Sequence, residues 1–230
     1  MKCAIFSDIH GNMSALREMF ADAAELRVEK YLFAGDVFGY FYEQDEIVSI
    51  LMENKNLYCV KGNHDENYLK ACEDKQYQME MSDKYGCSYQ IQLKKDKRKW
   101  LSLLPSCLEI QLGKRKICMV HGNLQDRLNG RIYPDALKEI PEAVKYDLLI
   151  MGHTHYGMLF KQGNCIILNP SSLGQPRDKQ GFRYAIYDTE KNSVQFREVC
   201  INIEELLEQV KKRESSKRNR EYLFKCYGEE

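Results

Sequence analysis

The stretch 2-KCAIFSDIHGN-12 joins a short apolar run to residue types that bind metals. The run KCAIFS has the length and composition of a buried strand. On extended backbone Asp8 and His10 would point the same way, while Ile9 between them would point into the core. Asn12 is a suitable N-cap for the amphipathic pattern that follows. The stretch therefore predicts a strand, a polar loop and a helix, which is the repeating unit of an α/β fold.

Similar units recur along the chain. Strand–helix alternation indicates a largely parallel sheet core, in which ligand groups gather at the carboxyl ends of the strands. A polar, Tyr-rich segment, 66–96, reads as an excursion beside the site and as partly helical. Further strands are expected near 30–34, 57–60, 116–120, 147–151, 165–168, 183–188 and 194–199, and helices near 13–24, 45–54, 97–104, 135–145 (interrupted by Pro141) and 203–210.

Length and composition limit the function classes. The 230 residues suffice for one large domain, and no internal repeat or flexible linker divides them. We expect a single domain over 1–230 that ends in a basic, helical tail at about 203–230. Lys+Arg and Asp+Glu are equal, at 34 each, so global charge indicates no polyanionic partner. The basic clusters 94–99 and 211–220 read as solvated faces, so a nucleic-acid partner is not indicated.

Cysteine usage bears on location. The nine cysteines are scattered, form no CxxC, and in several cases lie in apolar runs, which is typical of buried reduced thiols. No apolar run approaches the roughly 18 residues that cross a membrane, and the N-terminus has no signal-peptide pattern. We expect a cytoplasmic protein without a membrane partner. The sequence does not indicate an oligomeric state.

The five histidines all lie just beyond apolar runs, beside Gly, Asp, Asn or Thr. With two aspartates and one asparagine they form a mixed carboxylate and imidazole set, which suits divalent transition metals. No cysteine joins the set, so a closed thiolate zinc site is disfavoured. The set is too large for one ion, and two ions roughly 3.5–4 Å apart that share a carboxylate are typical of phosphoester hydrolysis. The motifs are DIH at 8–10, GD at 35–36, GNHD at 62–65, HG at 121–122 and GHTH at 152–155.

Other catalytic classes find less support. The sequence has no GxSxG elbow, no GxxxxGK[ST] loop and no GxGxxG fingerprint. Within GNHD, extended backbone would point Asn63 and His64 to opposite sides, so one metal is not expected to take both.

The ordered motif series resembles the calcineurin-like metallophosphoesterase superfamily from Lys2 to about Asp188, through DIHGN, GDVFGY, GNHD, VHGN, GHTH and NPSSLGQPRD. The resemblance implies an α/β fold with a two-sheet β-sandwich flanked by helices, in four layers (αββα), and a dinuclear centre at one rim. It implies that metal 1 is held by Asp8, His10, Asp36 and His155, and metal 2 by Asp36, Asn63, His121 and His153.

The resemblance also implies a metal-dependent phosphoesterase in which a hydroxide bridging two divalent metals attacks a small phosphodiester, monoester or dinucleotide. His64 matches the catalytic histidine of the family, and Asp65 is placed to orient it. Manganese is the expected metal, and iron, nickel, cobalt and zinc accept the same ligands.

Departures from the family pattern favour one branch. GDVFGYF lacks the phosphate-binding arginine of protein Ser/Thr phosphatases, so the chain looks more like the small bacterial phosphodiesterase-type group, which includes relatives resembling diadenosine tetraphosphatases. Ser171 replaces a typical glycine, which puts the turn shape in question. A non-catalytic scaffold, as in a retromer subunit, is the alternative from another class, but this chain retains the whole ligand set. Arg177, Asp126 and Tyr133 are candidate substrate-binding residues, with surface packing as their alternative role.

Overall fold

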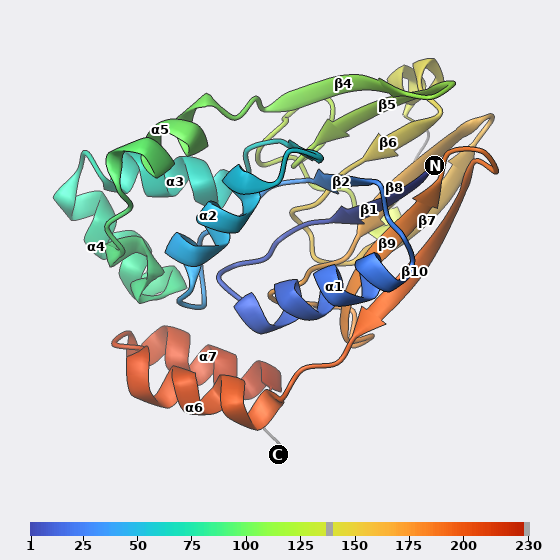
Figure 1. The fold of residues 1–230 in the computed structure, drawn as a ribbon. Coiled ribbons are helices and arrows are strands. Elements are labelled where there is room, and N and C mark those ends of the chain that lie inside the picture. The colour runs from blue at the N-terminus through green and yellow to red at the C-terminus, as the bar shows by residue number, and fades with distance from the viewer. Residues whose placement is uncertain (137–139, 228–230) are drawn as a thin grey trace.

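The computed structural model describes residues 1–136 and 140–227 and contains two five-stranded sheets (Figure 1). The first sheet has the order β10-β9-β1-β2-β3. Its strands are β1 (Lys2–Phe6), β2 (Lys30–Phe33), β3 (Leu57–Cys59), β9 (Phe182–Asp188) and β10 (Ser193–Val199). β1, β2 and β3 run parallel, whereas β9 and β10 are antiparallel additions at one side.

The second sheet has the order β4-β5-β6-β8-β7. Its strands are β4 (Cys107–Leu112), β5 (Arg115–Val120), β6 (Leu148–Ile150), β7 (Gly157–Gln162) and β8 (Cys165–Pro170). Only β5, β6 and β8 are parallel, so the expected parallel core is confined to three neighbouring strands in each sheet. Two edge strands, β4 and β7, were not predicted from the sequence. Both are half-exposed, so neither shows the continuous apolar run of a buried strand.

The buried hydrophobic residues form three clusters, and β1 contributes alternately to two of them. Cys3 and Ile5 point between the two sheets, whereas Ala4 and Phe6 point to the helices on the outer face. The outer face of the second sheet is covered in the described residues by short 3-10 segments, through Ile140 and Ala143. The two-sheet sandwich with flanking helices is therefore confirmed, and its second outer layer is thin.

Helices cover the first sheet and extend beside it. They are α1 (Met13–Glu25), α2 (Gln44–Glu53), α3 (Asn63–Ala71), α4 (Lys75–Tyr85) and α5 (Lys95–Leu103), followed at the C-terminus by α6 (Ile203–Arg213) and α7 (Lys217–Tyr227). Asn12 caps α1 as predicted, with its Oδ1 accepting from the Ala15 N–H at 3.1 Å. None of the described helices is long and apolar enough to cross a membrane.

Two expected regions differ from the structure. The segment 66–96 is mostly helical, because it holds most of α3, all of α4 and the 3-10 helix η1 (Cys87–Gln90). The expected helix 135–145 is instead two 3-10 helices, η2 (Pro134–Ala136) and η3 (Pro141–Lys145), and 137–139 lies outside the described residues. Pro141 begins η3, because a proline without an N–H is tolerated only in a first helical turn.

The basic C-terminal segment packs against the domain and is not a free tail. Helices α6 and α7 form a hairpin beneath α4 (Figure 1). Glu214, between them, is 3% exposed. Its carboxylate accepts from the Asn219 side-chain amide at 2.6 Å, the Ser216 N–H at 2.8 Å and the Cys87 N–H at 3.3 Å. The buried carboxylate thus joins the hairpin to η1.

Replacing this carboxylate should loosen the hairpin. Glu214→Ala leaves the N–H groups of Cys87 and Ser216 without this acceptor and removes one hydrogen bond of Asn219, so we expect the free energy of unfolding to fall by about 2–3 kcal/mol. Urea unfolding would measure the loss. Glu208→Ala, on the exposed face of α6, is the control and should change stability by less than about 0.5 kcal/mol. Equal stability of the two variants would contradict the docking role of Glu214.

Candidate metal centre

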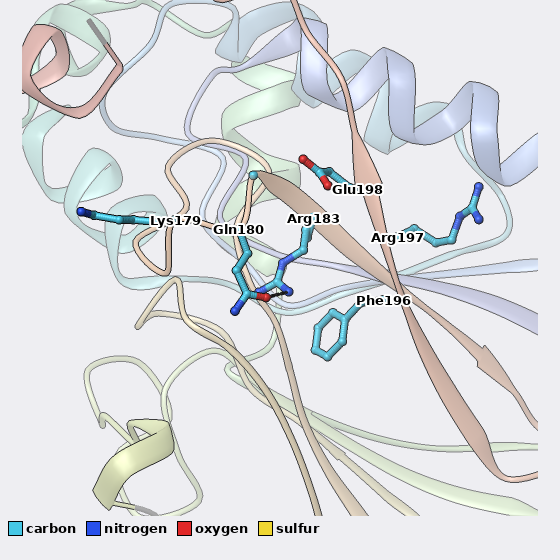
Figure 2. A pocket seen from close by; sticks show the side chains of 7 residues that line it. Lys179, Gln180, Arg183, Phe196, Arg197 and Glu198 are labelled. Atoms are coloured by element: carbon cyan, nitrogen blue, oxygen red, sulfur yellow. Dashed lines mark hydrogen bonds between the residues drawn. The ribbon is translucent and has the colours of Figure 1, made fainter. Parts of the chain in front are cut away.

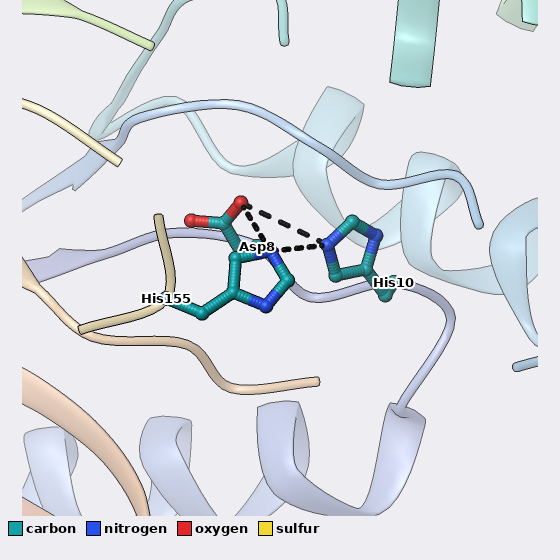
Figure 3. Close-up of side chains that lie close together, drawn as sticks. All are labelled: Asp8, His10 and His155. Carbon is teal, nitrogen blue, oxygen red and sulfur yellow. Dashed lines mark hydrogen bonds and ion pairs between the residues drawn. The ribbon is translucent and has the colours of Figure 1, made fainter. Parts of the chain in front are cut away.

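The carboxyl ends of the parallel strands bring seven metal-binding side chains together. Asp8 and His10 follow β1, and His155 follows β6 in the other sheet. These three form one group (Figure 3). His155 Nε2 lies 3.2 Å from Asp8 Oδ1 and 3.1 Å from His10 Nε2. The group therefore draws ligands from both sheets.

A second group lies beside the first. It contains Asp36, His121 and His153, with ligand atoms within 4.8 Å of one another. His121 Nε2 is 3.2 Å from Asp36 Oδ2 and 2.9 Å from Asn63 Oδ1. The same Asp36 Oδ2 lies 4.0 Å from His10 Nε2 of the first group. Asp36 is thus the carboxylate that touches both groups.

The histidine tautomers fit metal ligation. The Nδ1 atoms of three rings lie 2.5–2.8 Å from backbone carbonyls: His10 from Phe38, His121 from Ala34 and His155 from Gln175. A carbonyl only accepts, so each Nδ1 carries the hydrogen and each neutral ring presents an Nε2 lone pair. Two such lone pairs, of His10 and His155, face each other at 3.1 Å. A cation bound between them would relieve that contact.

Unpaired buried atoms point to the same conclusion. Asp8 Oδ1, Asp36 Oδ2 and His153 Nε2 are buried and have no hydrogen-bond partner within the described residues. Burial of such groups without a partner costs free energy. All three belong to the two groups above and face the positions that divalent cations would take. The donor set of carboxylates, imidazoles and one amide oxygen therefore fits two metal ions.

Electrostatics favour the neutral, ligating form of most rings. Burial and the neighbouring His155 hold the pKa of His10 well below its ordinary value. Burial and His121 lower the pKa of His153 to about 3. His121 is the exception: burial lowers its pKa, but the charge and hydrogen bond of Asp36, the charge of Asp8 and the Ala34 carbonyl together raise it to about 9. Metal binding to His121 would displace its proton.

The backbone at the ligands is left-handed and not extended, which corrects the expected geometry of DIH. Strand β1 ends at Phe6, and φ is 53° at Asp8 and 48° at His10. The side chains of Asp8 and His10 still reach the site, and Ile9 is buried as expected. Their directions, however, do not come from the alternation of side chains along a strand. Asp36, His153 and His155 are also left-handed, with φ of 70°, 68° and 63°. Such conformations cost roughly 1–2 kcal/mol each and cluster at functional sites.

Asn63 and His64 are also not extended, because they open helix α3. Their side chains nevertheless diverge. The Asn63 amide oxygen lies by His121, whereas the His64 ring lies 5.1 Å from the His10 ring and its Nδ1 is 2.6 Å from the Tyr89 hydroxyl. Asp36 Oδ1 accepts the His64 N–H at 2.8 Å, so the start of α3 is tied to the shared carboxylate.

Asp65 does not contact the His64 ring, contrary to the expected orienting role. Its Oδ1 accepts from the N–H groups of Val37 and Phe38, at 2.8 and 3.3 Å. Its Oδ2 accepts from those of Asp36 and Gly62, both at 3.0 Å. The buried carboxylate therefore fixes the loop that carries Asp36. The residue that hydrogen-bonds the His64 ring is Tyr89, which lies in the Tyr-rich segment whose contacts the sequence did not reveal.

The three expected substrate-binding residues lie in different surroundings. Arg177 Nη2 is 3.4 Å from the hydroxyl of Tyr40, whose ring lies 4.9 Å from that of His10. Arg177 is therefore near the first group. Asp126 instead caps a surface turn, accepting from the N–H groups of Leu128 and Asn129, and Tyr133 packs edge-on against Tyr156. The contacts of these two match their alternative, structural role.

Ser171 lies in a turn, and residues of the two basic clusters form ion pairs with nearby carboxylates. Ser171 has φ of 76°, so the turn keeps the conformation that glycine would adopt. Its hydroxyl donates to the His155 carbonyl at 3.3 Å. In 94–99, Lys97 pairs with Asp45 at 2.6 Å, and in 211–220 Arg213 pairs with Glu43. All nine cysteines are free thiols.

A separate pocket of about 440 Å³ lies over β9 and β10, away from the histidines (Figure 2). Two of its cations are already paired, Arg183 with Asp178 and Arg197 with Asp22. It therefore does not compete with the metal groups as the candidate site. Its lining residues are Lys179, Gln180, Gly181, Arg183, Phe196, Arg197 and Glu198.

Known proteins resemble the chain over most of its length. The family model described as the calcineurin-like phosphoesterase superfamily domain matches residues 1–192. An uncharacterised protein of Methanocaldococcus jannaschii is 27% identical over 231 residues, 91% of each chain. A hypothetical protein from Pyrococcus horikoshii OT3 has a TM-score of 0.84 at 22% identity, covering 100% of this chain and 99% of its own. A metallophosphoesterase from Sphaerobacter thermophilus has a TM-score of 0.70 at 23% identity, covering 92% and 93%. These two structures share the fold.

The role of Asp65 can be tested through stability. Asp65→Asn replaces one of the two accepting oxygens with a donor, so two of the four backbone N–H groups lose their partner. We expect the free energy of unfolding to fall by about 2–3 kcal/mol, measured by urea unfolding. Asp126→Asn, at the exposed turn, should change it by less than about 0.5 kcal/mol. An Asp65→Asn protein as stable as the parent would exclude the loop-fixing role.

Proposed function

The chain belongs to the calcineurin-like phosphoesterase superfamily, and on this premise we propose that it is a hydrolase of small phosphoesters, of the phosphodiesterase type, which uses two divalent metal ions. One observation supports this above all others. Asp36 Oδ2 is buried, has no hydrogen-bond partner within the described residues, and lies 3.2 Å from His121 Nε2 and 4.0 Å from His10 Nε2. This position supports the proposal that two adjacent ions share Asp36 as a ligand.

The chain's own residues divide the work of holding the ions. Asp8, His10 and His155 would hold one ion, Asn63, His121 and His153 the other, and Asp36 both. When bound, two such cations activate water as a nucleophile and neutralise charge on the phosphoryl group. Manganese is the first metal to test, and iron, nickel, cobalt and zinc suit the same donors.

His64 is the proposed hydrogen-bond donor to the leaving oxygen or to the phosphoryl group. Burial, together with His10, lowers the pKa of His64 well below its ordinary value, so the ring is neutral. Burial also raises the pKa of Tyr89 well above its ordinary value, so its hydroxyl keeps a proton that it can donate to His64 Nδ1. The imidazole hydrogen then resides on Nε2. Tyr89 is a positioning residue that selects this tautomer.

Arg177 is the proposed phosphate-binding cation. Its guanidinium hydrogen bonds within the described residues go to neutral oxygens, Tyr40 Oη at 3.4 Å and Gln175 Oε1 at 3.3 Å. A guanidinium beside a metal centre and without a carboxylate partner can bind phosphoryl oxygens. It comes from a different segment than the missing arginine of protein Ser/Thr phosphatases, which disfavours that class. The complete ligand set disfavours a non-catalytic scaffold.

Hydrolysis of bis(p-nitrophenyl) phosphate with added Mn²⁺ tests the proposal. We expect metal-dependent turnover by the parent protein and its loss in Asp36→Asn, together with loss of bound metal. His64→Ala should keep the metal content but lose about 10²–10³-fold in kcat, because a positioned hydrogen-bond donor to the reacting group is removed. Asn63→Ala should mainly weaken binding of the second ion. Metal content would be measured by plasma emission spectroscopy.

Two outcomes would contradict these assignments. No metal-dependent turnover on a panel of diesters, monoesters and dinucleotides, with any of the five metals, would favour a scaffold. Loss of both ions in His64→Ala would show that His64 is a ligand. Asp126→Asn is the control for surface substitutions and should keep both metal content and turnover.

Tyr89→Phe tests the tautomer argument. Removing the hydroxyl leaves His64 Nδ1 without its partner, so we expect kcat to fall about tenfold, the equivalent of roughly 1.4 kcal/mol, while KM and metal content stay unchanged. Steady-state kinetics with p-nitrophenyl esters would measure the change. Tyr133→Phe, whose ring packs on Tyr156 at the surface, is the matched control. An equal fall in kcat in the Tyr89→Phe and Tyr133→Phe variants would contradict a role for Tyr89 in the mechanism.

A further inference from the structure

The C-terminal hairpin lies outside the matched family domain, which ends at residue 192, yet it reaches the metal centre. The Tyr227 hydroxyl of α7 donates to the Gly174 carbonyl at 3.0 Å, and the Gly174 N–H donates to the Asp8 carbonyl at 2.8 Å. The Asn219 amide of α7 donates to the Tyr40 carbonyl at 3.4 Å. Helix α7 thus braces two loops that surround the first metal group.

Tyr40 is held in a strained conformation between these elements. Its φ is 59°, which an L-residue with a large side chain seldom adopts. Its N–H donates to the Tyr85 carbonyl at 2.7 Å, and its carbonyl accepts from Asn219. The strain places its ring 4.9 Å from that of His10 and 5.8 Å from that of His64. Strain maintained in this way, beside the metal groups, indicates a functional use of the ring.

Tyr222 continues this aromatic surface outward from α7. Its ring lies 6.0 Å from that of Tyr40, tilted by 36°. The residue is 37% exposed, so its side chain is accessible from solvent. Tyr227, five residues later, instead packs its ring on Phe182 and Phe41. Arg177 Nη2 lies 3.4 Å from the Tyr40 hydroxyl, so the guanidinium and the Tyr222 ring both neighbour the Tyr40 side chain.

We propose that Tyr222, Tyr40 and Arg177 form a substrate subsite that selects nucleoside phosphoesters, with the base stacked on the Tyr222 ring and a phosphoryl oxygen on Arg177. This inference rests on the proposed phosphoesterase function. The exposed ring supplies a π-face that any base can use, and the guanidinium supplies a charge for phosphate. Tyr40, which neighbours both, lies with its ring 4.9 Å from that of His10 and 5.8 Å from that of His64, so the subsite adjoins the first group.

Calorimetry on the Mn²⁺-loaded full chain tests the subsite without relying on turnover. AMP and ribose 5-phosphate share the phosphate and the sugar and differ only in the base. We expect AMP to bind the parent protein about tenfold more tightly, the size expected of one stacking contact. Tyr222→Ala should remove that difference and leave ribose 5-phosphate unchanged, whereas Tyr222→Phe should keep it. Phe224→Ala removes another ring from α7, one that lies near Lys211 on α6, and should also keep the difference.

The outcomes separate this inference from the proposed function. Equal binding of AMP and ribose 5-phosphate by the parent, no binding of either, or equal weakening of both by Tyr222→Ala would overturn the subsite. So would a preference for AMP that Tyr222→Ala leaves intact. Turnover of bis(p-nitrophenyl) phosphate is measured in parallel. Turnover without selectivity for AMP would reject the subsite alone, whereas selective binding without any metal-dependent turnover would reject the hydrolase.

Discussion

The site depends on one buried carboxylate, that of Asp36, whose two oxygens face different partners. Its Oδ1 accepts the His64 N–H at 2.8 Å and so fixes the start of α3, while its Oδ2 faces His121 and His10. If the carboxylate rotated, it would lose either the hydrogen bond from the His64 N–H or the position of Oδ2 beside His121 and His10. Asp65 fixes the backbone by accepting the Asp36 N–H, and a Cβ at Gly62 would collide with the carboxylate itself. The shared ligand is thus constrained from three directions.

The second constraint is the packing of one sheet on the other, because each metal group takes ligands from both. Hydrogen bonds cross between the sheets at the ligands themselves. His121 Nδ1 lies 2.8 Å from the Ala34 carbonyl, and the His153 N–H donates to Asp8 Oδ2 at 3.2 Å. The apolar residues between the sheets, such as Ile5 and Ile117, therefore hold the two halves of the site in register.

The sequence was informative about ligand identity because the ligands follow strands, and strands show in apolar runs. It was uninformative where a residue reaches the site through distant contacts. Tyr89 meets His64 across 25 positions, and Tyr222 meets Tyr40 across 182, so no local spacing marks either one. The left-handed conformations of Asp8 and His10 are equally hidden, since they arise from hydrogen bonds to the Gly35 and Asp36 carbonyls. The many basic residues of α6 and α7 suggested a tail. The one buried residue that docks the hairpin, Glu214, does not stand out among them in the sequence.

The same contacts imply unequal rigidity within the site. The rings of His10, His121 and His155, the candidate metal ligands, are held by hydrogen bonds of 2.5–2.8 Å to backbone carbonyls in a buried region. The residues proposed to meet the substrate come from three elements, and their mutual contacts are longer, 3.4 Å from Arg177 to Tyr40 and 6.0 Å between the rings of Tyr40 and Tyr222. Substitutions on α7 can therefore alter what lies beyond the phosphoryl group without disturbing the ligands. The candidate metal ligands are thus fixed at the strand ends, whereas the proposed substrate subsite includes the hairpin that packs against them.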